Sequence, residues 1–122
     1  MSNFEALKSI GAEVKRDKNN QLIIGFTSQK ITNEQLNLLS GVNEDCLLAF
    51  YSCDFSSCDL CLLKTSSFRK IAVIYCRFDN DQLCDICEIP SLNWLKIFDT
   101  KVTNEAVEKI LMKKNNLQIK LN

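Results

Sequence analysis

Two pairs of cysteines have a spacing that is typical of a chemical site. Within each pair, two residues separate the two cysteines. The pairs are Cys58-x-x-Cys61 and Cys84-x-x-Cys87. Paired thiolates at this spacing are ligands of structural zinc, which accepts four sulfurs in a tetrahedral arrangement. These four thiols are therefore candidate metal ligands.

The elements expected to carry these cysteines weaken the zinc hypothesis. The surrounding apolar residues recur three positions apart, which is the spacing of a helix, whereas such ligands usually lie on turns. Residues three apart share one face of a helix, so Cys84 and Cys87 are more simply interpreted as small fillers between helices. We expect a chain without a cofactor and keep zinc as the alternative.

The same thiols offer little as catalytic nucleophiles. The sequence contains no histidine, so activation would have to come from lysine or from a helix N-terminus. Only Cys58 falls in the expected first turn of a helix. No nucleophile, base and oxyanion donor can be assembled from these residues, and we expect a protein that is not an enzyme.

Composition narrows the remaining classes of protein. The 122 residues suit one domain, and 15 Lys plus Arg balance 15 Asp plus Glu, which disfavours nucleic acid as a partner. Three glycines and one proline leave no glycine-rich phosphate loop. No apolar run has the length of a membrane span, and residues 1–5 lack the pattern of a secretory signal. We expect a cytoplasmic protein whose seven cysteines are reduced.

The same order of apolar positions recurs four times along the chain, at a spacing of 23 or 24 residues. The fourth copy reads Leu92-x-x-Leu95-x-Ile97-x-x-Thr100-x-Val102, and the third reads Phe68-x-x-Ile71-x-Val73-x-x-Cys76-x-Phe78. The second copy supplies Leu48, Phe50, Cys53 and Phe55, and the first supplies Ile24, Phe26, Gln29 and Ile31. Asp45 and Gln21, at the first positions of these two copies, break the pattern.

A helix is expected after each copy, because a polar start precedes two apolar residues that lie three apart. The apolar pairs are Leu36 and Leu39, Leu60 and Leu63, Leu83 and Ile86, and Val107 and Ile110. The starts carry side chains that cap a first turn: Thr32-x-x-Gln35, Ser56-x-x-Asp59, Asp79-x-x-Gln82, and Thr103 before Asn104 and Glu105. Each copy therefore predicts a strand, a turn and a helix.

This pattern resembles the leucine-rich repeat family, whose units read L-x-x-L-x-L-x-x-N/C-x-L. The likeness covers roughly residues 21–122. It implies an α/β solenoid with a parallel β-sheet on the concave face and helices on the convex face. It also places Cys53 and Cys76 at the family's Asn/Cys position, where the role is structural. It implies no activity by itself.

Both ends of this expected solenoid carry covering segments, so that residues 1–122 form a single leucine-rich repeat domain. Residues 1–20 are the N-terminal cap, in which Ser2-x-x-Glu5 opens a helix that ends at Gly11 and a hairpin follows. Residues 21–112 hold the four repeats. Residues 113–122 form a C-terminal cap strand with alternating apolar positions.

The residues between the inward apolar positions face the other side of the expected sheet. That side should be mostly polar, yet it gathers aromatic and aliphatic side chains on adjacent strands, of types that anchor protein interfaces. The predicted partner-binding residues, with their polar rim, are Leu47, Tyr51, Lys70, Ile74, Tyr75, Trp94, Lys96, Phe98 and Asp99. The alternative is a register shifted by one residue, which would bury Lys96 and Asp99.

These observations favour a protein-binding module. We expect its concave aromatic face to occlude one protein partner, such as a cognate toxin or enzyme, in the manner of an inhibitor or immunity protein. The alternative is an adaptor or structural subunit of a complex, with or without a four-cysteine zinc site. Self-association through the same face is a further alternative. No nucleic acid or membrane partner is expected.

Overall fold

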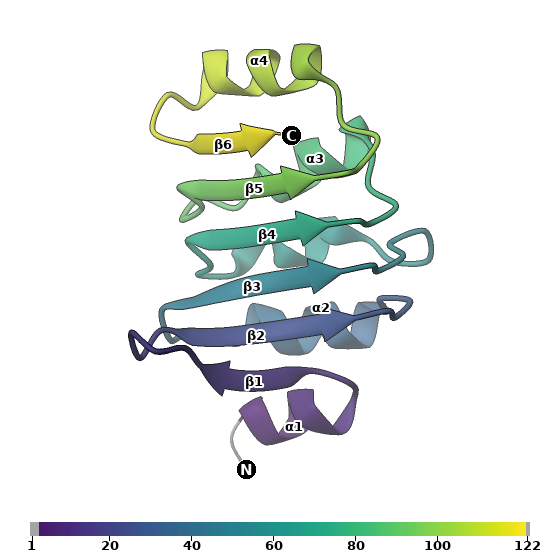
Figure 1. Ribbon diagram of the computed structural model, residues 1–122, viewed down its shortest axis with the longest axis vertical. Helices are drawn as coiled ribbons and strands as arrows, with labels where there is room; N and C mark the ends of the chain where they lie inside the picture. Colours follow the sequence, from purple (N-terminus) through teal and green to yellow (C-terminus); the bar gives the residue numbers. More distant parts are fainter. Residues whose placement is uncertain (1–2, 122) are drawn as a thin grey trace.

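In the computed structural model, which describes residues 3–121, the chain forms a six-stranded sheet with helices against one face (Figure 1). The strands lie in chain order: β1 (Glu13–Arg16), β2 (Leu22–Thr27), β3 (Cys46–Tyr51), β4 (Lys70–Ile74), β5 (Trp94–Phe98) and β6 (Gln118–Leu121). β1 pairs antiparallel with β2, and all other neighbours are parallel. The mixed α/β class, the mostly parallel sheet and the N-terminal hairpin are as predicted.

The helices lie between the strands in sequence. They are α1 (Asn3–Ser9), α2 (Asn33–Ser40), the 3-10 helix η1 (Leu60–Thr65), α3 (Asn80–Ile86) and α4 (Asn104–Lys113). In Figure 1, α2 and α3 lie behind the sheet, while α1 and α4 lie beside β1 and β6 at its two ends. One face of the sheet is therefore left without a covering helix, and we call it the open face.

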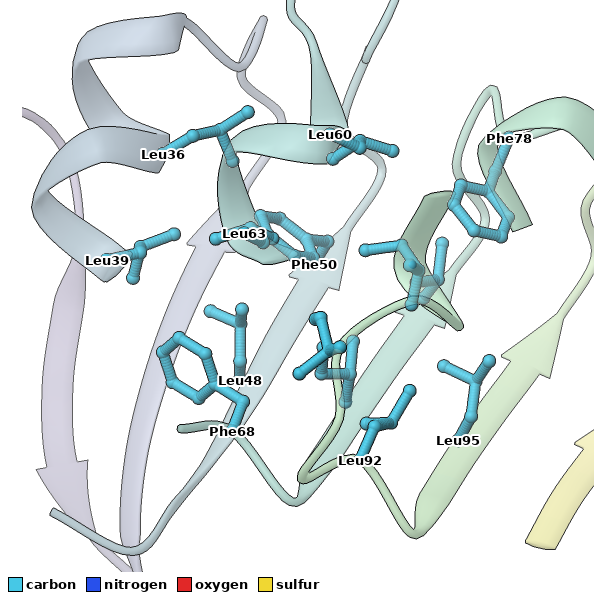
Figure 2. Close-up of a cluster of buried hydrophobic side chains, with 14 of the residues drawn as sticks. Leu36, Leu39, Leu48, Phe50, Leu60, Leu63, Phe68, Phe78, Leu92 and Leu95 are labelled. Atoms are coloured by element: carbon cyan, nitrogen blue, oxygen red, sulfur yellow. The ribbon is translucent and has the colours of Figure 1, made fainter. Parts of the chain in front are cut away.

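The core lies between the sheet and the helices. Figure 2 shows Leu36 and Leu39 of α2 and Leu60 and Leu63 of η1 pointing toward the strands, and all four are buried. Buried rings connect neighbouring units: Phe26 stacks on Phe50 with ring centroids 5.6 Å apart, and Phe55 meets Phe78 edge-on at 5.8 Å. The predicted inward set is thus the core of the fold.

The strand register agrees with the sequence pattern. Ile24 lies beside Leu48, Leu48 beside Ile71, and Ile71 beside Leu95. Lys96 and Asp99 are exposed. The shifted register, which would have buried those two residues, is therefore wrong.

Three of the four predicted helix starts are confirmed. Thr32 and Asp79 each accept a hydrogen bond from the backbone of a glutamine three residues later, and that glutamine side chain returns to the cap backbone. The Thr103 side chain accepts a hydrogen bond from Ala106 N. Such pairings satisfy the free N–H groups of a first helical turn.

The predicted start at Ser56 is wrong, because the second unit has a 3-10 helix that begins four residues later. Asp59 is its N-cap and accepts a hydrogen bond from Cys61 N at 3.0 Å. The cap is fixed from outside the unit, since Asp59 N donates to Asn33 Oδ1 of α2 at 2.8 Å. Ser56 N instead donates to Asp54 Oδ1 within a turn. Cys58 therefore precedes the helix, and the prediction that it lies in the first helical turn is wrong.

The N-terminal cap is tied to the first unit by a buried glutamine. The predicted capping residue Ser2 lies outside the described residues, but α1 ends before Gly11, whose φ of 105° suits glycine. Gln35, 4% exposed, donates to Ile10 O at 2.7 Å and accepts from Thr32 N at 2.8 Å. One side chain thus satisfies backbone groups of both segments.

The variant Gln35→Leu tests this junction. We expect it to lower the free energy of unfolding by about 2 kcal/mol, because it leaves the Ile10 carbonyl and the Thr32 N–H without their buried partner. Urea unfolding measures the change. Asn37→Leu, at an exposed position of the same helix, is the control and should change stability much less. Equal effects of the two variants would contradict the assignment.

Candidate binding face

The open face is built from alternate strand residues and from the turns that follow the strands. Its rows run across the sheet in register, so that Leu47 lies beside Lys70 and Lys70 beside Trp94. A second row places Tyr51 beside Ile74 and Ile74 beside Phe98. The two rows are four residues apart along each strand, which is about 13 Å.

The turn after each of four successive strands contains a residue in the left-handed backbone region. These residues are Ser28, Ser52, Tyr75 and Asp99, with φ between 53° and 57°. Three of their backbone N–H groups donate to a carbonyl at the end of the next strand, each at 2.9 Å. The repeated bond fixes the same turn in each unit and presents the residue at the edge of the open face.

Tyr75 is the unusual member of this set. A left-handed conformation is tolerated by Asp and by small residues more readily than by a bulky one, for which it costs on the order of 1 kcal/mol. Its ring meets Tyr51 at a centroid distance of 5.4 Å and Phe98 at 5.2 Å, both edge-on. Tyr51 and Tyr75 are 47% and 46% exposed. We call Tyr51, Tyr75 and Phe98 the aromatic row.

Three lysines accompany the aromatic row on the open face. Lys70, Lys96 and Lys120 are exposed, and Lys96 lies directly beside Lys120 in the register. Within residues 3–121, none of their ammonium groups has an ion-pair or hydrogen-bond partner. We call these residues the lysine patch.

The predicted site residues all reach the open face or its edge, but they gather at two ends of it. Leu47, Lys70 and Trp94 lie where the strands begin, whereas Tyr51, Ile74 and Phe98 lie where they end. Tyr75 and Asp99 follow in the turns, and Lys96 lies between the two ends. Leu47, Ile74, Trp94 and Phe98 are partly exposed.

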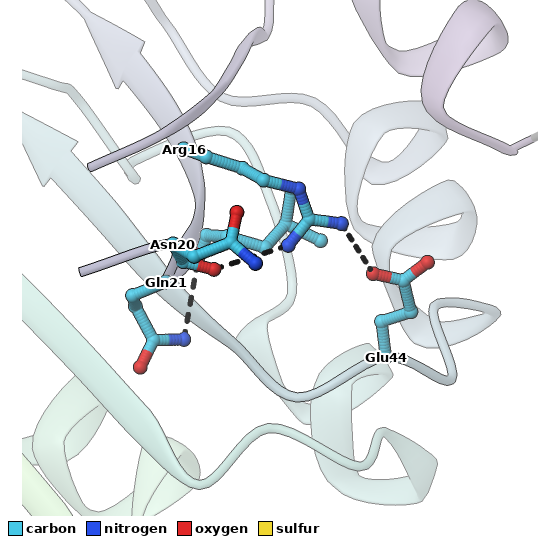
Figure 3. Close-up of polar contacts among 5 residues, drawn as sticks. Arg16, Asn20, Gln21 and Glu44 are labelled. Carbon is cyan, nitrogen blue, oxygen red and sulfur yellow. Dashed lines mark hydrogen bonds and ion pairs between the residues drawn. The ribbon is translucent and has the colours of Figure 1, made fainter. Parts of the chain in front are cut away.

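A groove of about 620 Å³ lies where the strands begin, against the turn of the β1–β2 hairpin. Its lining includes Leu47, Lys70 and Trp94 from the predicted set. The hairpin side of the lining is held by Arg16, which donates to Asn20 O at 3.2 Å and to Glu44 Oε2 at 3.4 Å (Figure 3). Asp17 Oδ1 accepts from Asn19 N and Gln21 N, each at 2.9 Å.

Sequence reasoning missed the hairpin side of this groove, which comprises Arg16, Asp17, Asn19, Asn20 and Gln21, and also missed Asp45, which directly precedes β3. A signal was present in the repeat. Gln21 and Asp45 are the two positions at which a polar residue replaces the first apolar residue of the pattern. The equivalent Phe68 and Leu92 are buried. The groove lies beside the two units that lack this apolar residue.

Cys53 and Cys76 form a buried ladder beneath the turns. Cys53 N donates to Cys76 Sγ at 3.3 Å, and the two thiols donate to Phe26 O and Phe50 O of the preceding units. The hydrogen bond with Cys53, together with burial, raises the pKa of the Cys76 thiol. These contacts join successive units, which fits the structural role that the resemblance implied.

The four cysteines proposed as zinc ligands are not brought together. The Cys58 thiol donates to Phe55 O at 3.4 Å, Cys87 is buried at the C-cap of α3, and Cys61 and Cys84 are exposed. In the described part of the chain, the one group of three ligand atoms within 4.8 Å of one another is Asp59, Cys61 and Asp85. The geometry gives the four-cysteine site no support.

No protein-family model, curated protein or solved structure matches this chain at a significant level. Among residues 3–121, no helix is long and apolar enough to cross a bilayer. What the protein binds must therefore be argued from its own side chains.

The exposed thiol of Cys61 is expected to react slowly with iodoacetamide, and its rate in the wild type and in Asp85→Ala tests the cause. Hydrogen bonding to Asp85, then burial and Asp59, raise the pKa of Cys61 to about 11. Because the thiolate is the nucleophile, Cys61 should react slowly at pH 8 and its rate should rise until the pH passes about 11. Asp85→Ala should speed its modification about tenfold at pH 8, since each unit of pKa changes the thiolate fraction tenfold.

Mass spectrometry of tryptic peptides over a time course measures both rates. The wild-type rate of Cys61 under the same conditions is the reference, because Asp85 is adjacent to Cys84 and its substitution also changes the surroundings of that thiol. A Cys61 rate that Asp85→Ala leaves unchanged would show that the aspartate does not hold the thiol.

Proposed function

We propose that this chain is a short solenoid of the leucine-rich repeat type and that it binds another protein on its open face. Two observations support the architecture. Strand, turn and helix follow one another in successive units, and each strand lies parallel to and in register with the next. The open face would be the concave side of such a solenoid, and residues 3–20 and 113–121 would cover its ends.

The single observation that carries the binding role is the aromatic row. An uncovered sheet face is ordinarily polar, whereas here two tyrosines are about half exposed. Tyr75 has a backbone conformation that disfavours a bulky side chain, and its ring packs edge-on against Tyr51 and Phe98. Tyrosine buries a large area at a low cost in side-chain entropy and keeps a hydroxyl for hydrogen bonding. The cost of holding Tyr75 in this conformation is offset if a partner uses its ring.

The action that we propose is occlusion of a cognate protein, such as an enzyme or a toxin. The described residues form one small sheet with its helices, so the effect on a partner comes from covering part of the partner's surface. The proposal assigns no catalytic step to this chain. Burial raises the pKa of the Cys46 and Cys87 thiols to about 12, which keeps them protonated and unreactive near neutral pH.

Affinity capture from a lysate of the source cell tests this function with the double variant Tyr51→Ser/Tyr75→Asn. Asparagine tolerates the left-handed conformation of residue 75, so the fold should be retained and the circular dichroism unchanged. Loss of the two rings should weaken binding of the captured partner at least about thirtyfold. Quantitative mass spectrometry of the bound proteins measures the loss.

Met112→Ser is the matched control, because it removes an 85% exposed apolar side chain from α4 instead of the open face. It should capture the same protein as the wild type. The activity of that protein, assayed with and without an excess of this chain, separates an inhibitor from an adaptor. A partner bound equally by the wild type and the double variant would contradict the placement of the site.

A further inference from the structure

The charged residues of this neutral chain are distributed unevenly over its two sides. On the open face, Lys15 is paired with Glu13 at 3.2 Å, Asp99 lies at the edge, and Asp17 and Asp45 line the groove beside Lys70. The helix side carries lysines such as Lys64, Lys109 and Lys113 together with more numerous acidic residues in or beside its helices: Glu34, Asp59, Asp79, Asp81, Asp85, Glu88, Glu105 and Glu108. The lysines of the patch that lie away from an acidic side chain are therefore Lys96 and Lys120.

The lysine patch is unfavourable in the isolated protein. Lys96 and Lys120 are direct cross-strand neighbours, and like charges in that arrangement destabilise a sheet. Lys70 lies on the next strand, one row away, since Ala72 is the neighbour of Lys96. Asp17 and Asp45 line the groove beside Lys70, but no acidic residue on β4, β5 or β6 faces Lys96 and Lys120, so this pair has no counter-charge on its own strands.

We propose that the partner docks an acidic segment of its chain on the open face, with carboxylates on the lysine patch and an apolar or aromatic side chain on the aromatic row. This inference rests on the proposed function and adds the chemistry of the partner. Carboxylates between Lys96 and Lys120 replace a repulsion with two attractions, which is the complementarity that specific interfaces use.

The dimensions of the face suit a short extended segment. The five strands β2 to β6, spaced about 4.8 Å apart, span about 19 Å, and the rows from Ile23 to Ser28 span about 17 Å. An extended segment of about six residues would cross it.

The floor between the two ends of the face suits the close approach of a main chain. Gly25 lies beside Ala49, and Ala49 lies beside Ala72. Ala72 is only 8% exposed on this uncovered face, because Lys70, Ile74 and Lys96 surround it with larger side chains. The larger side chains on either side of this floor, at the two ends of the strands, would then contact the side chains of the bound segment.

A displayed library of short random peptides, sorted with fluorescently labelled full-length protein, tests the inference. Peptides that also bind Tyr51→Ser/Tyr75→Asn are discarded, so the remaining ones depend on the open face. We expect them to be enriched in Asp and Glu over the unsorted library. Binding of a selected peptide should fall with added salt and should weaken about tenfold in Lys70→Gln/Lys96→Gln/Lys120→Gln.

The matched control is Lys64→Gln/Lys109→Gln/Lys113→Gln, which removes the same charge from exposed positions on the helix side. It should bind the selected peptides as the wild type does. Peptides that depend on the aromatic row without acidic enrichment, or that bind equally well to the lysine-patch variant, would overturn the acidic segment and leave the proposed site intact. If no selected peptide depends on the aromatic row, both the acidic segment and the proposed binding site are overturned.

Two further measurements exclude other occupants. An oligothymidylate that binds the wild type as tightly as the selected peptides, and loses binding in the lysine-patch variant, would replace the acidic segment with nucleic acid. Light scattering over a range of protein concentrations tests for a second copy, whose acidic helix side would otherwise supply the carboxylates. Assembly that the lysine-patch variant abolishes would overturn the inference, and a monomer throughout would support it.

Discussion

The stacking of equivalent inward side chains from unit to unit is the interaction on which the rest of this structure depends. Ile24, Leu48, Ile71 and Leu95 form one continuous buried row across β2 to β5, and ring contacts such as Phe26 on Phe50 run beside it. A shift of one residue in any strand would turn this row toward water, so the register is strongly held. Because outward positions alternate with inward ones, the same row also fixes which residues form the open face.

This dependence explains why much of the fold and of the open face could be predicted from the sequence. A period of 23 or 24 residues carries the register, and the caps at Thr32, Asp79 and Thr103 each bond a backbone N–H three residues later in the same unit. The start of the second helix could not be predicted in this way, because Ser56-x-x-Asp59 contains two residues of capping type. In the folded chain Ser56 N is bonded to Asp54 Oδ1 in a turn, and Asp59 is the N-cap. The groove also depends on separate elements, since Asp45, Lys70 and Trp94 meet the hairpin turn only in the folded chain.

Several features of the open face carry a cost in the isolated protein. Tyr75 has an unfavourable backbone conformation, although its ring contacts Tyr51 and Phe98; two tyrosines are half exposed; and Lys96 faces Lys120 across neighbouring strands. Each of these costs on the order of 1 kcal/mol or less. The helix side is different, because its caps and buried leucines follow the ordinary rules of local stability. Local rules are broken mainly on one face, which is where a binding role would concentrate such costs.

The position of the lysine patch connects binding to the end of the sheet. β6 is the terminal strand, it has one neighbour, and its inward residues Ile119 and Leu121 are only partly buried. Units stacked in one direction are held mainly by their nearest neighbours, so a like-charged pair on the terminal strand weakens the docking of that strand. An anion bound by both Lys96 and Lys120 stabilises the docking of β6. By linkage, the docking of β6 stabilises anion binding by the same free energy. If the open face binds its partner as proposed, its affinity and the order of the C-terminal strand are two measures of one coupling.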